Sequence, residues 1–158
     1  MLQFPAQDAQ TLIRLALTED VRTGDFTSLW TLPAKQVQTA TLIAKENGIV
    51  AGLPVIPLVF SELGGDVKID AFIKDGDSVK VGDKIATITG ETKTLLSGER
   101  VMLNFLQQLS GVATITGKFA AVLKGGKTKV LDTRKTIPGF RTLQKSIDLI
   151  ERKYLRKK

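Results

Sequence analysis

The chain has 158 residues, of which 42% are hydrophobic and 25% are charged, a balance typical of a folded protein with a sizeable core. It contains no cysteine and no histidine, which excludes disulfides, thiolate nucleophiles, Cys/His zinc sites and imidazole-dependent catalysis. The net charge of +7 is uneven: residues 118–158 carry 13 basic and 3 acidic side chains. Such a concentration suits an anionic partner, either a phosphate, a carboxylate or a nucleic acid. For the basic residues at 151–158, a solvated helix end is the favoured interpretation.

The first half of the chain predicts a helix, a strand, a turn and a second helix. Residues 8–20 show an apolar stripe at helical spacing, with Asp8 as the N-cap. Residues 37–44 are typical of a strand, and Asn47-Gly48 indicates a hairpin turn after it. Residues 53–63 are apolar enough for a short buried helix that ends at two glycines.

The second half begins with strands and continues with helices. Between residues 66 and 90, short strands alternate with Asp-Gly turns. Residues 91–124 hold two helical stretches, with a break expected at Gly111. Residues 128–132 are typical of a buried strand, and a final helix is expected over 139–157.

No segment predicts membrane insertion or secretion. The longest apolar run, residues 49–60, is too short for a bilayer and is interrupted by glycine and proline. The first ten residues lack the basic and apolar regions of a secretory signal. We therefore expect a cytoplasmic location, which the absence of cysteine also fits.

The densest candidate site follows the strand predicted at 128–132. Thr133, Arg134, Lys135 and Thr136 stand between this strand and the final helix. Side chains at the carboxyl end of such a strand face the region where α/β proteins bind ligands. Arginine can hold a carboxylate or phosphate with two parallel hydrogen bonds, and lysine supplies a point charge. An ordinary loop with solvated cations explains the pattern equally well.

Two other clusters are weaker on their pattern alone. Arg100 precedes a strongly apolar helical stretch, so it could present its guanidinium at a helix start, but a surface pair with an acid such as Glu99 is favoured. Residues 19–27 combine acids with glycine and threonine. They lack the spacing of a calcium loop, so a helix-capping loop is favoured there.

Five motifs in order resemble one family. They are EDVRTGDFTS at 19–28, AKENGIVAG at 44–52, DGDSVKVGDKIATITG at 75–90, LLSGERVMLNFLQQLSGVAT at 95–114 and VLDTRKTIPGFR at 130–141. Together they resemble the N-terminal half of quinolinate phosphoribosyltransferases (carboxylating nicotinate-nucleotide pyrophosphorylases). A molybdenum-associated paralogue shares part of this pattern, which leaves the substrate open between the two.

The resemblance implies an α+β architecture with two parts and a tail. Residues 1–111 would form an α/β sandwich with four strands and helices against one face, and residues 112–145 would begin an α/β barrel. Residues 146–158 form a divergent basic tail. In this family the active site lies at a homodimer interface, where the N-terminal domain of one subunit closes the barrel of the other.

The resemblance also implies a reaction and its ligands. Quinolinate and 5-phosphoribosyl 1-pyrophosphate, with Mg²⁺, give nicotinate mononucleotide, CO₂ and pyrophosphate. By motif position, Arg100 would reach the substrate carboxylates across the dimer, and Thr133, Arg134 and Lys135 would contact quinolinate and the donor. No catalytic side chain and no metal ligand of the protein is assigned.

The family pattern stops after Lys145, where a Cys-Gly-rich stretch and an Asn-His-Arg motif would follow. We therefore expect a truncated chain with little activity alone. A non-catalytic dimerisation or binding module is the alternative. The turn pattern of residues 75–90 also resembles that of a lipoyl- or biotinyl-like carrier. Carriers need a modifiable lysine at a hairpin tip, which these residues lack, so this alternative is disfavoured. Binding of nucleic acid by the basic tail is disfavoured as well, because the tail has no aromatic platform on which bases could stack.

Overall fold

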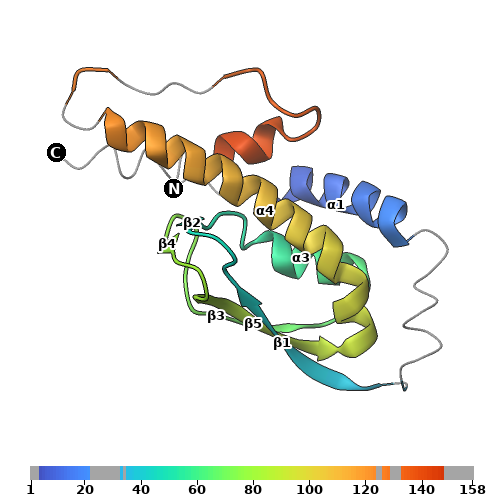
Figure 1. Cartoon of the computed structure of the whole chain (residues 1–158). Coiled ribbons are helices and arrows are strands. Elements are labelled where there is room, and N and C mark those ends of the chain that lie inside the picture. Colours follow the sequence, from blue (N-terminus) through green and yellow to red (C-terminus); the bar gives the residue numbers. More distant parts are fainter. Residues whose placement is uncertain (1–3, 22–32, 34, 124–125, 129–132, 148–158) are drawn as a thin grey trace.

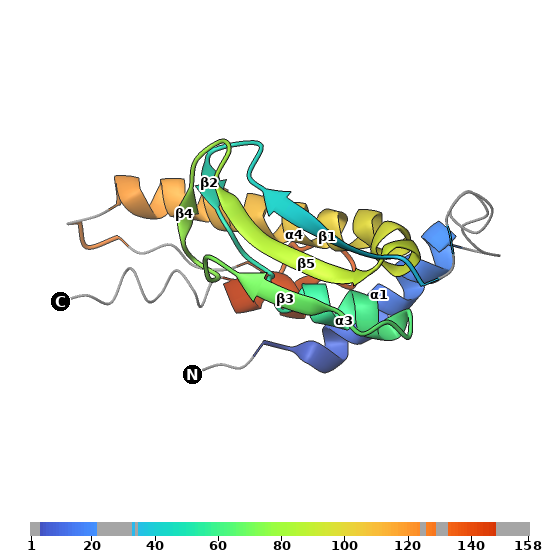
Figure 2. The ribbon, with the colours of Figure 1, turned by 90° about the horizontal axis from the view of Figure 1, so that it is seen from below.

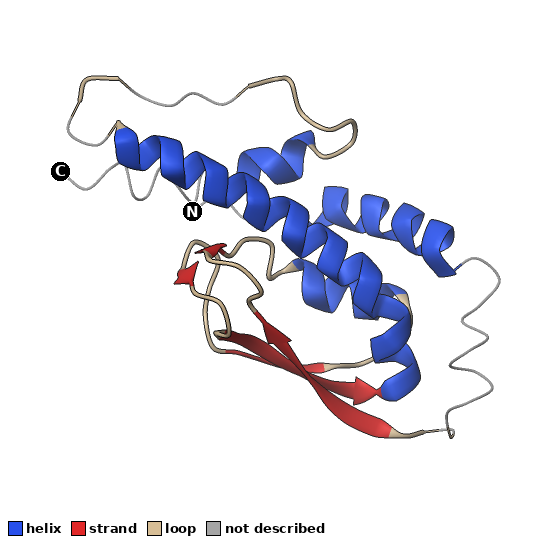
Figure 3. Ribbon diagram, in the orientation of Figure 1, coloured by secondary structure: helices blue, strands red, loops and turns tan. Residues whose placement is uncertain are grey.

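Helix α4 (Thr92–Val122) crosses the molecule and contacts most other elements (Figure 1). The computed structural model describes residues 4–21, 33, 35–123, 126–128 and 133–147. An antiparallel sheet lies on one side of α4, and α1 (Ala6–Val21) and a short helix at 141–147 lie on the other (Figure 3). Helix α3 (Val55–Glu62) packs against both α1 and α4. The main hydrophobic core joins all four helices to the sheet.

Helix α1 confirms the predicted apolar stripe. Its buried residues are Ala9, Ile13 and Leu17, which recur at helical spacing and face α3 and α4. The predicted N-cap is wrong, because the helix begins at Ala6 and Asp8 lies in its first turn. An acid in that turn remains favourable, since the N-terminus of a helix carries partial positive charge.

The main sheet has three strands, β1 (Val37–Ile43), β5 (Lys84–Glu91) and β3 (Lys68–Ala71), in the order β1-β5-β3. Both pairings are antiparallel. Seen from below, the strands lie in front of the helices, so the helices cover one face of the sheet (Figure 2). The resemblance implied four strands in this sheet, whereas the described residues form three strands and a separate two-stranded pair.

The predicted hairpin at Asn47-Gly48 is wrong. Strand β1 pairs with β5, more than forty residues along the chain, and β2 (Gly48–Ile49) pairs with β4 (Ser78–Val79). The side-chain oxygen of Asn47 accepts a hydrogen bond from the Val81 N–H at 2.9 Å. Asn47 therefore ties this crossover to the loop after β4 instead of turning the chain back on β1.

Helix α3 forms where the sequence predicted it, despite two prolines. Pro54 is its N-cap, and Pro57 lies in the first turn, where a missing N–H removes no helical hydrogen bond. The helix ends before Gly64 and Gly65, as expected, and the Gly65 N–H donates to the carbonyl of Phe60 at 3.0 Å.

The break expected at Gly111 is also wrong, because α4 is a continuous helix of 31 residues. Leu109 and Ala113 on either side of Gly111 are fully buried, and a glycine inside a helix costs only about 1 kcal/mol relative to alanine. Burial of α4 along most of its length outweighs that cost. Three apolar side chains near its end remain exposed, namely Ile115, Phe119 and Val122.

The last predicted elements are described only in part. Four residues of the strand expected at 128–132 lie outside the described residues, so that prediction stays open. The final helix, expected over 139–157, is present at 141–147; residues 139 and 140 form a turn before it, and residues 148–157 lie outside the described part. Among the described helices, none is long and apolar enough to cross a membrane.

Asp75 joins the β3–β4 connection to the start of α3. Its two carboxylate oxygens accept hydrogen bonds from the backbone N–H groups of Gly52 and Leu53, at 3.0 and 2.9 Å. Gly52 has a φ of +97°, which glycine adopts without the strain that a side chain would add. Burial raises the pKa of Asp75, although the two N–H donors act in the opposite direction.

We expect Asp75→Asn to lower the free energy of unfolding by about 1–2 kcal/mol, because an amide has one acceptor oxygen for two partly buried N–H groups. Chemical denaturation at pH 7 measures this change. Asp77→Asn is the matched control, since one carboxylate oxygen of Asp77 accepts the Lys74 N–H and the amide keeps one acceptor oxygen. Equal losses for the two variants would show that the double acceptor has no special role.

Candidate anion-binding site

The segment Thr133–Lys135 presents its three side chains to solvent. The Lys135 N–H donates to the Thr133 hydroxyl oxygen at 3.1 Å, which turns the chain at this point. Because a hydroxyl has one proton and two lone pairs, Thr133 still has a proton to donate to an anion. Two cations and a hydroxyl therefore stand side by side on one short turn.

Arg141 braces this turn from the helix that follows it. Its Nη2 donates to the carbonyl of Arg134 and its Nε to the hydroxyl of Thr136, both at 3.4 Å. Arg141 belongs to the motif at 130–141, but its place in the sequence predicts no role for it. Its guanidinium links the first turn of the 141–147 helix to Arg134 within the turn and to Thr136 just after it.

The short helix that follows the turn is anchored in the core. Leu143 and Ile147 are 0% and 2% exposed and belong to the main hydrophobic core. The ring of Phe140 stacks on Phe105 of α4, with centroids 5.2 Å apart and planes at 28°. The cationic turn is therefore held by a packed anchor on α4.

Arg100 lies inside α4, on the third turn rather than at the helix start that the sequence indicated. Its Nη1 donates to Oδ1 of Asp20 on α1 at 2.7 Å. This confirms the expectation of a surface pair with an acid, but the acid lies 80 residues away. Two residues earlier, a Cβ on Gly98 would lie 2.7 Å from the ring of Phe60, so glycine permits α3 to approach α4 here.

The structure brings together three of the four predicted site residues and places the fourth elsewhere. Thr133, Arg134 and Lys135 share one turn, whereas Arg100 is held against the end of α1. Residues 19–27 were expected to form a capping loop; residues 19–21 are instead the last turn of α1, and residues 22–27 lie outside the described residues. Asp20 was missed as a partner of Arg100, because no local pattern reports a contact across 80 residues.

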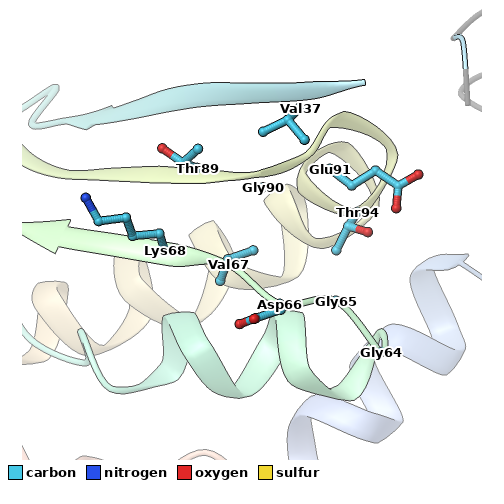
Figure 4. Close-up of a pocket in the computed structure, with 10 residues that line it drawn as sticks. All are labelled: Val37, Gly64, Gly65, Asp66, Val67, Lys68, Thr89, Gly90, Glu91 and Thr94. Carbon is cyan, nitrogen blue, oxygen red and sulfur yellow. The ribbon is translucent and has the colours of Figure 1, made fainter. Parts of the chain in front are cut away.

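Two cavities lie among the described residues named below, and neither is lined by the predicted site residues. A hollow of about 510 Å³ lies at the end of the sheet beside Val37, Gly64 and Thr94 (Figure 4). A larger cavity of about 1110 Å³ lies between β1 and α4, with a mixed lining that includes Leu42, Glu99 and Lys118. The exposed cations remain the candidate site, since a small anion can be bound at an open surface by charged hydrogen bonds.

Comparison with known proteins identifies the group to which these features belong. The sequence matches the family described as quinolinate phosphoribosyl transferase, through its N-terminal domain over residues 25–110 and its C-terminal domain over residues 112–150. It is 37% identical over 147 residues to quinolinate phosphoribosyltransferase (decarboxylating) 2b, mitochondrial, of Nicotiana tabacum. It is 39% identical over 143 residues to nicotinate-nucleotide pyrophosphorylase (carboxylating) of Mycobacterium leprae.

Solved structures give the same result. The nicotinate-nucleotide pyrophosphorylase of Francisella tularensis superimposes with a TM-score of 0.87 at 36% sequence identity, covering 94% of this chain. The match covers 53% of that structure, and the two curated relatives are covered over 41% and 49% of their lengths. The chain thus spans about half the length of the relatives it matches.

We expect Phe140→Leu to loosen the anchor of the cationic turn. Leucine keeps apolar area but loses the ring stack, which is worth about 0.5–1.5 kcal/mol. Hydrogen exchange at the amides of residues 143–147 should therefore accelerate by roughly twofold to tenfold. Ile137→Ala is the control, because Ile137 is 42% exposed and should leave these amides unchanged. Equal acceleration by both variants would contradict an anchor specific to Phe140.

Proposed function

Because the chain belongs to the quinolinate phosphoribosyltransferase family, we propose that it binds quinolinate and 5-phosphoribosyl 1-pyrophosphate for conversion to nicotinate mononucleotide, CO₂ and pyrophosphate. The observation that carries this proposal is the turn Thr133–Lys135, which holds two exposed cations on an anchored loop. Both proposed substrates are multiply charged anions. The excess of basic residues over 118–158 favours their approach as well.

The three side chains suit different parts of these ligands. The planar guanidinium of Arg134 can hold a carboxylate through two parallel N–H···O bonds. The ammonium of Lys135 is a compact charge suited to a phosphate oxygen, and the Thr133 hydroxyl can donate to the same group. We infer that Arg134 binds a carboxylate of quinolinate while Lys135 and Thr133 orient the donor.

The proposed reaction needs no nucleophile from the protein. The pyridine nitrogen attacks C1 of the ribose, and the C1–oxygen bond breaks as pyrophosphate leaves with its electron pair. The C2 carboxylate then departs as CO₂, and the ring carbon takes up a proton from water. The work left to the protein is positioning and stabilisation of charge, for which cations at fixed places are suited. The absence of cysteine and histidine is consistent with this chemistry.

We propose that Mg²⁺ enters with the donor, bound by its phosphate oxygens as part of the substrate. Within the part of the chain that the structure describes, no group of three or more acidic or histidine side chains could hold a metal ion.

We further propose that the protein acts in the cytoplasm, although two plant relatives carry the names mitochondrial and chloroplastic.

We also propose a homodimer, in which Arg100 of one subunit serves the cationic turn of the other. In the single chain Arg100 is paired with α1, and the cationic turn is anchored elsewhere on α4. A second copy would bring Arg100 and the cationic turn together.

A non-catalytic assembly module is the second candidate function, favoured by the exposed apolar side chains of Ile115, Phe119 and Val122. Such a module would dimerise without binding quinolinate.

Isothermal titration with quinolinate tests the proposed site directly. We expect Arg134→Gln to weaken binding by roughly tenfold or more, because a charge-assisted hydrogen bond contributes about 1.5–3 kcal/mol. Lys127→Gln removes another exposed charge outside the site and should change the affinity little. Equal losses in both variants would show attraction by bulk charge only.

Light scattering tests the dimer. We expect a mass about twice that of the 17.2 kDa chain. A monomer at the protein concentrations used for the titration, with quinolinate present, would contradict a site shared between two subunits.

A further inference from the structure

We propose that Asp20 is a positioning residue that holds the Arg100 guanidinium in the direction of the quinolinate carboxylates, an inference that rests on the proposed function. The two side chains meet at 2.7 Å between Nη1 and Oδ1, from elements 80 residues apart. The Asp20 side chain is only 23% exposed, whereas that of Arg100 is 73% exposed. A half-buried carboxylate thus anchors a side chain that extends into solvent.

The position of Asp20 on its own helix is unfavourable without such a partner. Helix α1 ends at Val21, and its last turn contains Glu19 and Asp20 but no basic residue. The carboxyl end of a helix carries partial negative charge, so acids in the last turn destabilise it. A cation from α4 offsets this repulsion, which gives a physical reason for an acid at this place.

Attachment of α1 to the rest of the protein does not require Asp20. Ala9, Ile13 and Leu17 bury one face of α1 in the core. Arg14 of α1 also pairs with Glu62 of α3, with Nε and Oε1 at 2.6 Å. This second ion pair resembles the first in exposure, at 65% for the arginine and 17% for the acid. It therefore provides a matched comparison.

The geometry of arginine explains what the anchor achieves. A guanidinium is a rigid plane with five N–H donors, so holding one nitrogen fixes the direction in which the whole group points. A long exposed side chain otherwise loses rotamer freedom when it binds a ligand. Restraint by Asp20 removes part of that loss before quinolinate arrives, and a correctly oriented guanidinium then meets the carboxylate.

The test is isothermal titration of the full chain with two ligands, quinolinate and 5-phosphoribosyl 1-pyrophosphate. We expect Asp20→Asn to weaken quinolinate binding by roughly twofold to fivefold, the range typical of an exposed ion pair. Affinity for the phosphoribosyl donor should stay unchanged, because Arg100 is proposed to address the carboxylates of quinolinate. Asp20→Glu keeps the negative charge and should restore part of the affinity.

Two further variants separate the possible outcomes. Glu62→Gln breaks the other ion pair of α1 and should leave both affinities unchanged; if it matches Asp20→Asn, the effect is loosening of α1 and the inference is overturned. If Arg100→Gln weakens quinolinate binding while Asp20→Asn leaves it unchanged or tighter, only the positioning role fails. If the wild-type chain does not bind quinolinate, or Arg100→Gln has no effect, the role of Arg100 in the proposed function fails and the inference with it.

Discussion

The packing of α4 in the hydrophobic core is the constraint on which the other features depend. Its buried residues, among them Met102, Phe105 and Leu109, contact the sheet, α1, α3 and the 141–147 helix within one core. Arg100 projects from the same helix, and the cationic turn is anchored to it through Phe105. The two cationic places therefore have fixed positions because one helix supports both.

The elements set by local pattern were predictable from the sequence, and those set by distant contacts were not. The apolar stripe of α1 and the end of α3 before two glycines follow from residues close together in the sequence. The pairing of β1 with β5 depends on residues more than forty positions apart, so the strong turn signal at Asn47 was misleading. Gly111 was misread for a similar reason, because burial on either side keeps α4 helical through it.

The candidate site divides in the same way. Thr133, Arg134 and Lys135 were found because they are adjacent in the sequence and form part of a family motif. The contact of Asp20 with Arg100 could not be found, since it joins two helices separated by 80 residues. Family membership, which two family models and the solved relatives support, gives these cations a chemical context. In that context we propose a dianionic pyridine and a phosphorylated sugar as the ligands, since exposed cations suit both kinds of anion.

The most direct measurement of the central claim is an NMR titration of the labelled chain with quinolinate. Amide shifts report where a small ligand binds on a protein of 17.2 kDa. We expect saturable shifts concentrated at residues 133–136 and around Arg100, with little change along the open face of the sheet. Shifts confined to the cavity between β1 and α4, or spread evenly over the surface lysines, would contradict it.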